Sequence, residues 1–205
     1  MVGRRLNQTF PERSQQPGDI VLEVNNLTRE NVLNDINFTL RKGEILGIAG
    51  LVGSGRTELV RALYGADRKD DADIKLKGRK IKIASPQDSI NNGIGLLPED
   101  RKQQGLVLSQ SVKYNITLAN LRSIINNIFI NKTREKTVVN DYIDKISIKT
   151  PSPAILTRSL SGGNQQKVVL AKWLYTDSNI LIFDEPTRGI DVGAKFEIYR
   201  LMNEL

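Results

Sequence analysis

The sequence predicts an α/β fold in which strands alternate with helices along the chain. Residues 44–49 form a compact apolar stretch of strand length, and after a glycine-rich turn residues 56–64 have the spacing of an amphipathic helix. The same order returns later, where the apolar residues 179–183 precede a helical pattern over 192–204. Strands followed by helices in this way indicate a parallel sheet with crossover helices.

The other elements follow from the same periodicities. Apolar and polar residues partly alternate, or form short buried runs, over the expected strands 20–27, 32–40, 72–83 and 94–97. Helical spacing predicts helices over 112–130, 133–147 and 164–175. Gly65 is a plausible helix stop. Residues 1–18 have the composition of a linker, so the folded domain is expected over 19–205, with a helical insertion at about 101–160.

Composition excludes several classes of mechanism. The chain has no cysteine and no histidine, so disulfides, thiolate metal sites and histidine-based triads are ruled out. No apolar run reaches the roughly 18 residues of a membrane span, which favours a cytoplasmic protein. The net charge of +7 fits nucleic acid, anionic lipid or nucleotide phosphates as partners, and it equally fits a scattered basic surface.

Residues 50–57 match the phosphate-binding pattern G-x-x-x-x-G-K-[ST] at every fixed position but one. Glycines let backbone N–H groups converge on phosphate oxygens, and the following helix directs its positive end at them. The exception is Arg56, which keeps the positive charge of lysine but has a planar guanidinium in place of a compact ammonium. The predicted nucleotide-binding residues are Gly50, Leu51, Val52, Gly53, Ser54, Gly55, Arg56 and Thr57.

Two adjacent acids follow the apolar run that ends at Phe183. Asp184 is expected at the carboxyl edge of a parallel strand, where ligands of α/β sheets bind. With Thr57 it would hold Mg²⁺, and Glu185 would orient or deprotonate an attacking water. A plain acidic pair at a strand end is the alternative interpretation.

Another candidate anion site precedes the helix predicted over 164–175. Ser161 is a good helix N-cap, and two glycines beside it expose backbone N–H groups. An ordinary capped helix after a flexible turn is the alternative. The residues of this segment are Leu160, Ser161, Gly162, Gly163, Asn164 and Gln165.

The order of these three motifs resembles the ATP-binding cassette (ABC) family. Leu-Ser-Gly-Gly-Asn-Gln-Gln-Lys lies between a phosphate loop and a strand ending in Asp-Glu-Pro. Residues 98–102 and 186–195 are similar to the second ATPase domain of fused ribose- and galactose-type importers. The resemblance implies a P-loop NTPase fold of the ABC type, with a mixed or parallel core, an antiparallel β subdomain and a helical subdomain. It also implies that a C-terminal portion is missing and that apolar surface or a sheet edge is exposed.

In that family, two ATPase domains face each other and each nucleotide lies between one phosphate loop and the other domain's signature. The resemblance therefore implies ATP and Mg²⁺ as cofactors, with the signature over ATP held by a first domain of the same polypeptide. Asp191 would lie where paired domains touch. Further implied partners are membrane permease subunits and, indirectly, a sugar-binding protein, with no nucleic acid. The implied location is the cytoplasmic membrane face.

Three departures fall on the domain's own site. Arg56 replaces lysine, and Glu99 stands where the family places a nucleotide-site glutamine. No aromatic residue occurs between Val24 and Val32, where many relatives stack a tyrosine on adenine. We therefore expect weak binding and slow turnover at this site, weak activity of the chain alone, and a signature that mainly serves the partner. A soluble ABC ATPase acting on DNA or ribosomes, or a non-catalytic nucleotide sensor, remains an alternative.

Overall fold

The computed structural model describes residues 16–205, so nearly all of the predicted linker over 1–18 lies outside the described residues. The described residues form two compact units. The sheet unit comprises residues 16–99 and 173–184, and the helical unit comprises residues 100–172 and 185–205. The chain passes from one unit to the other after Glu99, Lys172 and Asp184.

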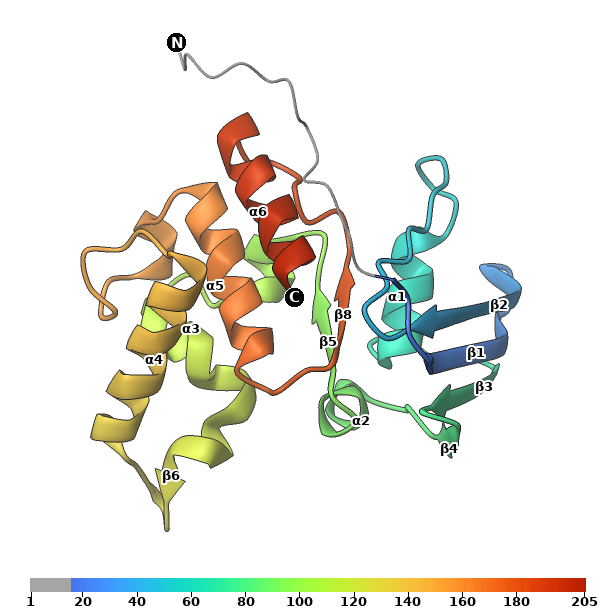
Figure 1. Cartoon of the computed structure of the whole chain (residues 1–205), viewed down its shortest axis with the longest axis horizontal. Coiled ribbons are helices and arrows are strands. Elements are labelled where there is room, and N and C mark those ends of the chain that lie inside the picture. Colours follow the sequence, from blue (N-terminus) through green and yellow to red (C-terminus); the bar gives the residue numbers. More distant parts are fainter. Residues whose placement is uncertain (1–15) are drawn as a thin grey trace. The chain divides into compact units, whose positions relative to one another are not determined.

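A four-stranded antiparallel sheet forms one part of the sheet unit (Figure 1). Its order is β2 (Leu33–Arg41), β1 (Ile20–Arg29), β3 (Asp71–Leu76) and β4 (Arg79–Ile81). In β1, Leu22, Val24 and Leu27 are at most 2% exposed. The register shifts between Val24 and Leu27, where Asn26 has a φ of 54°, and this bulge turns Leu27 to the buried face.

The stretch predicted as one strand over 72–83 is a hairpin. β3 and β4 are joined at Lys77 and Gly78, whose φ angles are 50° and 75°. Positive φ at both central residues is the geometry of the tight turn that suits the twist of paired strands. The alternation was therefore interpreted correctly as β structure, but the turn at Gly78 was missed.

The second part of the sheet unit carries the predicted parallel pairing. β5 (Ile94–Leu97) runs parallel to β8 (Ile180–Phe183), with Leu97 opposite Phe183. α1 (Arg56–Tyr64) ends at Gly65, whose φ of 78° confirms the predicted helix stop. α2 (Pro86–Asn91) begins with a capping box between Ser85 and Asp88.

The prediction of a strand over 44–49 is wrong. These residues have no regular structure, and Ile45, Leu46 and Ile48 are 46%, 38% and 44% exposed. A strand needs hydrogen-bonding neighbours, and within residues 16–205 no strand pairs with this segment. Apolar composition alone therefore did not suffice to order it as β structure.

The helical unit is built from four α-helices and shorter turns. They are α3 (Val112–Thr117), α4 (Lys132–Ile146), α5 (Gly162–Leu174, whose last two residues belong to the sheet unit) and α6 (Val192–Glu204). Arg101–Gly105 forms a π-helical turn, and Leu118–Ile124 and Thr157–Ser159 are 3₁₀ turns. No helix of the described residues is both long and apolar enough to span a bilayer.

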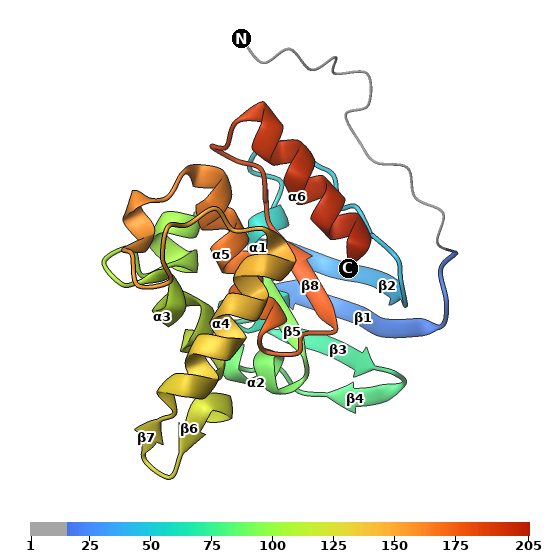
Figure 2. The same cartoon turned by 60° about the vertical axis from the view of Figure 1, so that its left-hand side comes forward.

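Helical spacing over 112–130 predicted more helix than is present. Regular α-helix stops at Thr117, and β6 (Ile125–Asn126) and β7 (Phe129–Ile130) form a small hairpin before α4 (Figure 2). Asn127 has a φ of 58°, which asparagine tolerates better than most residues. Ile128 and Phe129 at its tip are 82% and 74% exposed.

Asn115 joins three segments of the helical unit through buried hydrogen bonds. It is 1% exposed, its side-chain amide donates to Thr157 Oγ1 at 2.9 Å, and its side-chain oxygen accepts from the Val107 amide at 2.7 Å. Asn115→Ala should therefore lower the free energy of unfolding by about 2 kcal/mol, because buried partners lose their bonds. Urea unfolding checks this, with the exposed Asn140→Ala as control. Equal losses for both variants would contradict it.

Lys172 gives the helical unit a pH-dependent stability. Its Nζ donates to the Gly105 carbonyl at 2.6 Å, and burial lowers its pKa from 10.5 to about 8. Between these two values the unfolded chain binds more protons, so the free energy of unfolding rises with pH there. Compared with Lys172→Met, the wild type should gain on the order of a few kcal/mol across that window in urea titrations. A difference independent of pH would refute this.

Candidate functional site

The glycine-rich loop is an open turn that ends at the first residue of α1. Gly53 and Gly55 have φ angles of 81° and 87°, which side chains with a Cβ rarely adopt. The Ser54 amide donates to the Leu51 carbonyl at 3.1 Å, and Leu51 and Val52 are 84% and 96% exposed. An exposed loop at a helix N-terminus offers backbone N–H groups to an anion such as phosphate.

Arg56 is the first residue of α1, and its stem turns back along the loop. A Cβ placed on Gly50 would lie 3.6 Å from Arg56 Cδ, and it would collide with Ser54 Oγ. A side chain at position 50 would therefore force the Ser54 side chain to move. Arg56, which stands where the pattern has lysine, thus lies beside the glycine-rich turn and is partly exposed.

The sheet unit brings together three of the predicted polar residues. Because Leu97 pairs with Phe183 in the parallel ladder, Glu99 and Asp184 leave the sheet at the same edge. Thr57 Oγ1 donates to Glu99 Oε2 at 3.5 Å. The Asp184 amide donates to the Leu97 carbonyl at 2.9 Å, and Asp184 is only 7% exposed.

The negative charge of Asp184 affects the pKa of an arginine in α1. The pKa of Arg61 is raised, chiefly by its hydrogen bond to Asp67 and to a lesser degree by the charges of Asp67 and Asp184. Arg61 Nη2 lies 2.7 Å from Asp67 Oδ1, and Arg29 binds the other oxygen of the same carboxylate at 2.9 Å. These ion pairs fix the last turn of α1 to β1 and so hold the helix whose start carries Thr57.

The donor set fits Mg²⁺ bound together with nucleotide phosphates. Thr57 and Asp184 supply a hydroxyl and a carboxylate, which are hard oxygen ligands. Among residues 16–205 no group of three or more acidic residues is placed to hold a metal. Mg²⁺ commonly takes one or two protein ligands and completes its shell from phosphates and water, so these two residues are adequate.

Glu185 belongs to the helical unit and has an uncommon backbone conformation. Its φ is 44°, and its side chain is exposed. A left-handed conformation costs a residue with a Cβ on the order of 1 kcal/mol and is often found at functional sites. The turn is closed by the Arg188 amide, which donates to the Glu185 carbonyl at 3.0 Å.

In the signature segment, some side chains are exposed and others pack inward. Ser161 is exposed, whereas Leu160 and Gln165 are 9% and 5% exposed. The side-chain amide of Gln165 donates to the carbonyls of Thr157 and Leu160, at 3.3 and 3.2 Å, so it fixes the preceding turn.

The remaining signature residues have local structural roles. The Asn164 side chain bonds Ser161 Oγ and accepts from the Lys149 amide. A Cβ on Gly163 would lie 2.6 Å from that of Ala194, so this glycine lets α5 and α6 approach closely. Asp191 caps α6 by accepting from the Ala194 amide at 2.9 Å.

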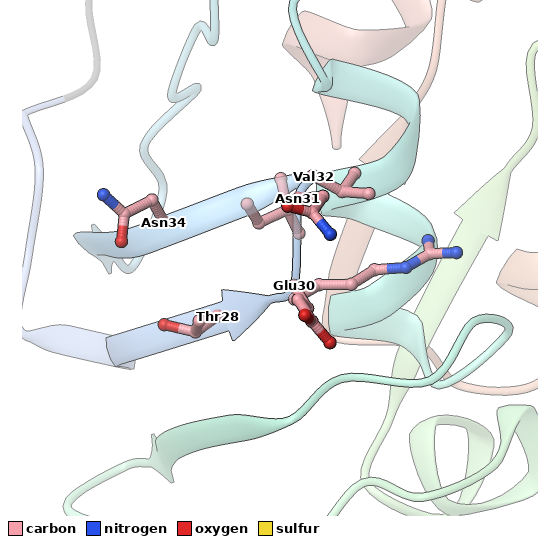
Figure 3. A pocket seen from close by; sticks show the side chains of 7 residues that line it. Thr28, Glu30, Asn31, Val32 and Asn34 are labelled. Atoms are coloured by element: carbon pink, nitrogen blue, oxygen red, sulfur yellow. The ribbon is translucent and has the colours of Figure 1, made fainter.

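A shallow pocket lies at the turn between β1 and β2, beside the start of α1 (Figure 3). The carbonyl oxygen of Val32 lies 3.4 Å from where a Cβ on Gly55 would be. The seven residues that line the pocket include no aromatic: Thr28, Arg29, Glu30, Asn31, Val32, Leu33 and Asn34. A nucleotide base bound next to this turn would contact Val32, which is 41% exposed, instead of an aromatic ring.

The family model for ABC transporters matches residues 33–188. The chain belongs to the ABC transporter family. It is 52% identical to the ribose import ATP-binding protein RbsA of Clostridium tetani, covering 100% of this chain and 41% of that protein. It is 53% identical to the xylose import ATP-binding protein XylG of Moorella thermoacetica, covering 100% and 42%. The chain thus spans about two fifths of the length of these relatives.

Solved structures agree on the fold. A nucleotide-free ATP-binding cassette from an ABC transporter matches with a TM-score of 0.76 at 20% identity, covering 91% of this chain and 77% of that one. The protein cbiO1 from Clostridium perfringens matches with a TM-score of 0.72 at 24% identity, covering 91% and 73%. The predicted fold, a P-loop ABC fold with an antiparallel β subdomain and helices, is therefore confirmed.

Arg101 lies in the motif over 98–102, but the sequence did not predict it as a site residue. In the structure it is 8% exposed and donates to the carbonyls of Arg188 and Gly189, at 2.8 and 3.1 Å. No local pattern could reveal this bond, because its partners are backbone atoms more than 80 residues away.

The backbone of the phosphate loop makes a direct test possible. Gly55→Ala should lower the free energy of unfolding by about 1–2 kcal/mol, because alanine is strained at this positive φ. Gly47→Ala is the matched control, since nothing lies within 4 Å of its Cβ position and its φ is not in the left-handed region. Thermal unfolding of both variants checks this, and equal melting temperatures would argue against the loop conformation.

Proposed function

We propose that this chain is the second ATP-binding cassette of a fused monosaccharide-importer ATPase, which couples ATP binding and hydrolysis to sugar transport. The observation that carries the proposal is the edge formed by Thr57, Glu99 and Asp184 beside the glycine-rich loop. The named relatives import ribose or xylose, and the chain's share of their length leaves room for another cassette. ATP with Mg²⁺ is the ligand that this edge accommodates best.

Different residues of the chain would bind the phosphates, orient the metal ion and activate the attacking water. Backbone amides of residues 50–55 would bind the phosphates, with Arg56 adding charge. Mg²⁺, when bound, would neutralise charge that develops on the phosphates, and Thr57 and Asp184 would orient it. Glu185 would orient or deprotonate the attacking water from its strained, exposed position.

We infer further that this site contributes less to turnover than the signature does. The guanidinium of Arg56 is a planar group with less freedom than an ammonium to follow the β- and γ-phosphates. Glu99 adds a negative charge next to Thr57, and the β1–β2 turn offers no aromatic ring to adenine. Ser161 and the adjacent glycines would complete the site of a first ATPase domain in the same polypeptide.

Membrane permease subunits are the proposed direct partners, and a sugar-binding protein is the indirect one. The protein would lie at the cytoplasmic face of the membrane. The relatives are named for ribose, galactose, methyl galactoside and xylose, so a small monosaccharide is the proposed cargo class. Nucleic acid is not among the proposed partners, because no motif of the sequence links the net positive charge to nucleic-acid binding.

The proposed asymmetry predicts unequal effects of two substitutions in the complete transporter. Ser161→Arg should abolish most ATP turnover, about 100-fold or more, because a long cation blocks the signature's approach to phosphate. Arg56→Ala should cost less, about tenfold or below. Steady-state ATPase rates in proteoliposomes with the binding protein and sugar provide the measurement.

Thr133→Arg, at an exposed position in the first turn of α4, controls for the added charge and should leave the rate unchanged. The proposal fails if Arg56→Ala abolishes turnover while Ser161→Arg spares it. It also fails if neither variant alters ATP-dependent uptake.

A further inference from the structure

Arg101 is a buried cation that is held by backbone carbonyls. It is 8% exposed, and its two terminal nitrogens donate to Arg188 O and Gly189 O. Its Nε is buried and has no hydrogen-bond partner. Burying a guanidinium is costly, so an arginine that serves only to fill space would be replaced at little loss by an apolar residue.

A glycine at the start of α5 makes room for this guanidinium, and a second glycine allows the backbone turn that contacts it. A Cβ on Gly162 would lie 2.7 Å from Arg101 Nη2 and 3.2 Å from the Gly189 carbonyl. Gly189 has a φ of 64°, and its Cβ position lies 3.7 Å from Arg101 Nη1. The guanidinium therefore lies between the first residue of α5 and the loop over 185–190, and it contacts both.

A second buried cation joins the same turn to the other end of α5. Arg101–Gly105 is the π-helical turn, and its last carbonyl accepts from Lys172 Nζ at 2.6 Å. Asp100 caps its start by accepting from the amides of Lys102 and Gln103, at 2.8 and 3.1 Å. The turn thus approaches the start of α5 closely through Arg101 and is hydrogen-bonded to its other end through Lys172, and π-helical turns are rare and frequently functional.

The positions of these contacts along the chain suggest what they do. The π-helical turn begins two residues after Glu99, and the 185–190 loop begins directly after Asp184. Inside the helical unit, Arg101 joins these two segments to each other and to the start of the signature helix. One side chain therefore sets the relative positions of three segments that belong to different motifs.

We propose that Arg101 is a positioning residue, which fixes the loop over 185–191 against the first turn of α5 so that Glu185 and Ser161 are presented on one rigid surface. Arg101 itself does not touch nucleotide in this proposal. The ordering of the loop stands on contacts within the helical unit alone. Its consequence for ATP turnover rests on the proposed function.

Hydrogen exchange of the intact protein tests the ordering without any nucleotide. In Arg101→Met the two carbonyls lose their charge-assisted donors, so amides over 187–191 and over 165–167, the first hydrogen-bonded amides of α5, should exchange about tenfold faster. Amides of α4, which Arg101 does not contact, should keep their protection. Arg158→Met, which removes an exposed arginine from the same unit, is the matched control and should change neither segment.

Kinetics of the complete transporter test the consequence. Arg101→Met should lower kcat about 10- to 100-fold with little change in the KM for ATP, because the reacting groups are misplaced while binding residues remain. Arg101→Lys should recover part of kcat, since one ammonium can reach one carbonyl but lacks the fork that reaches two. If Arg101→Met lowered kcat only because packing volume is lost, Arg101→Lys would not be expected to restore it.

Each outcome decides the proposal. Local loss of protection together with a kcat effect supports it. Unchanged exchange over 187–191 overturns it, and so does uniform loss of protection that includes α4, because Arg101 would then only stabilise the unit. If exchange changes locally while no ATPase activity exists in any form of the protein, the positioning role stands and the proposed function fails.

Discussion

The parallel pairing of β5 with β8 is the constraint on which the candidate site depends. Four residues on each strand align Leu97 with Phe183, and this register brings the following carboxylates, Glu99 and Asp184, to one edge of the sheet unit. A slip of one residue would displace Asp184 along the strand by about 3.3 Å relative to Glu99 and separate these groups. This ladder of four residue pairs therefore determines which carboxylates meet at the candidate site. The ion pairs of Asp67 complete the arrangement by fixing α1, which carries Thr57, to β1.

Much of the fold could be predicted because the decisive signals are local. The helix over 56–64 and the strands over 94–97 and 180–183 depend on periodicity and on turn residues such as Gly65, all visible within a short window. The irregular conformation of residues 44–49, where a strand was expected, could not be predicted in this way. Whether apolar residues form a strand depends on neighbours elsewhere in the chain, and the residues alone do not reveal them. The hairpin over 125–130 was missed because isoleucines separated by asparagines also fit a helical spacing.

The candidate site shows the same limit at the level of side chains. Sequence reasoning expected Asp184 at the carboxyl edge of a parallel strand beside Thr57, and it assigned Glu99 to the nucleotide site only through the family resemblance. It did not distinguish Ser161, which is exposed, from Gln165, which is turned inward to bond the backbone. It also gave both signature glycines a ligand role, whereas Gly162 makes room for Arg101 and Gly163 lets two helices meet. A glycine can thus satisfy packing and phosphate binding at once, and sequence alone does not separate the two requirements.

The exposed segment over 44–49 also affects how the chain behaves in solution. Its backbone amides are not used in any ladder of the described residues, and isoleucine and leucine side chains flank them. Such a segment is a template to which another extended chain can add as a strand. Residues 44–49 are therefore open to pairing with an extended segment of another molecule. Because they lead directly into residues 50–57, a strand added there would lie next to the candidate phosphate loop.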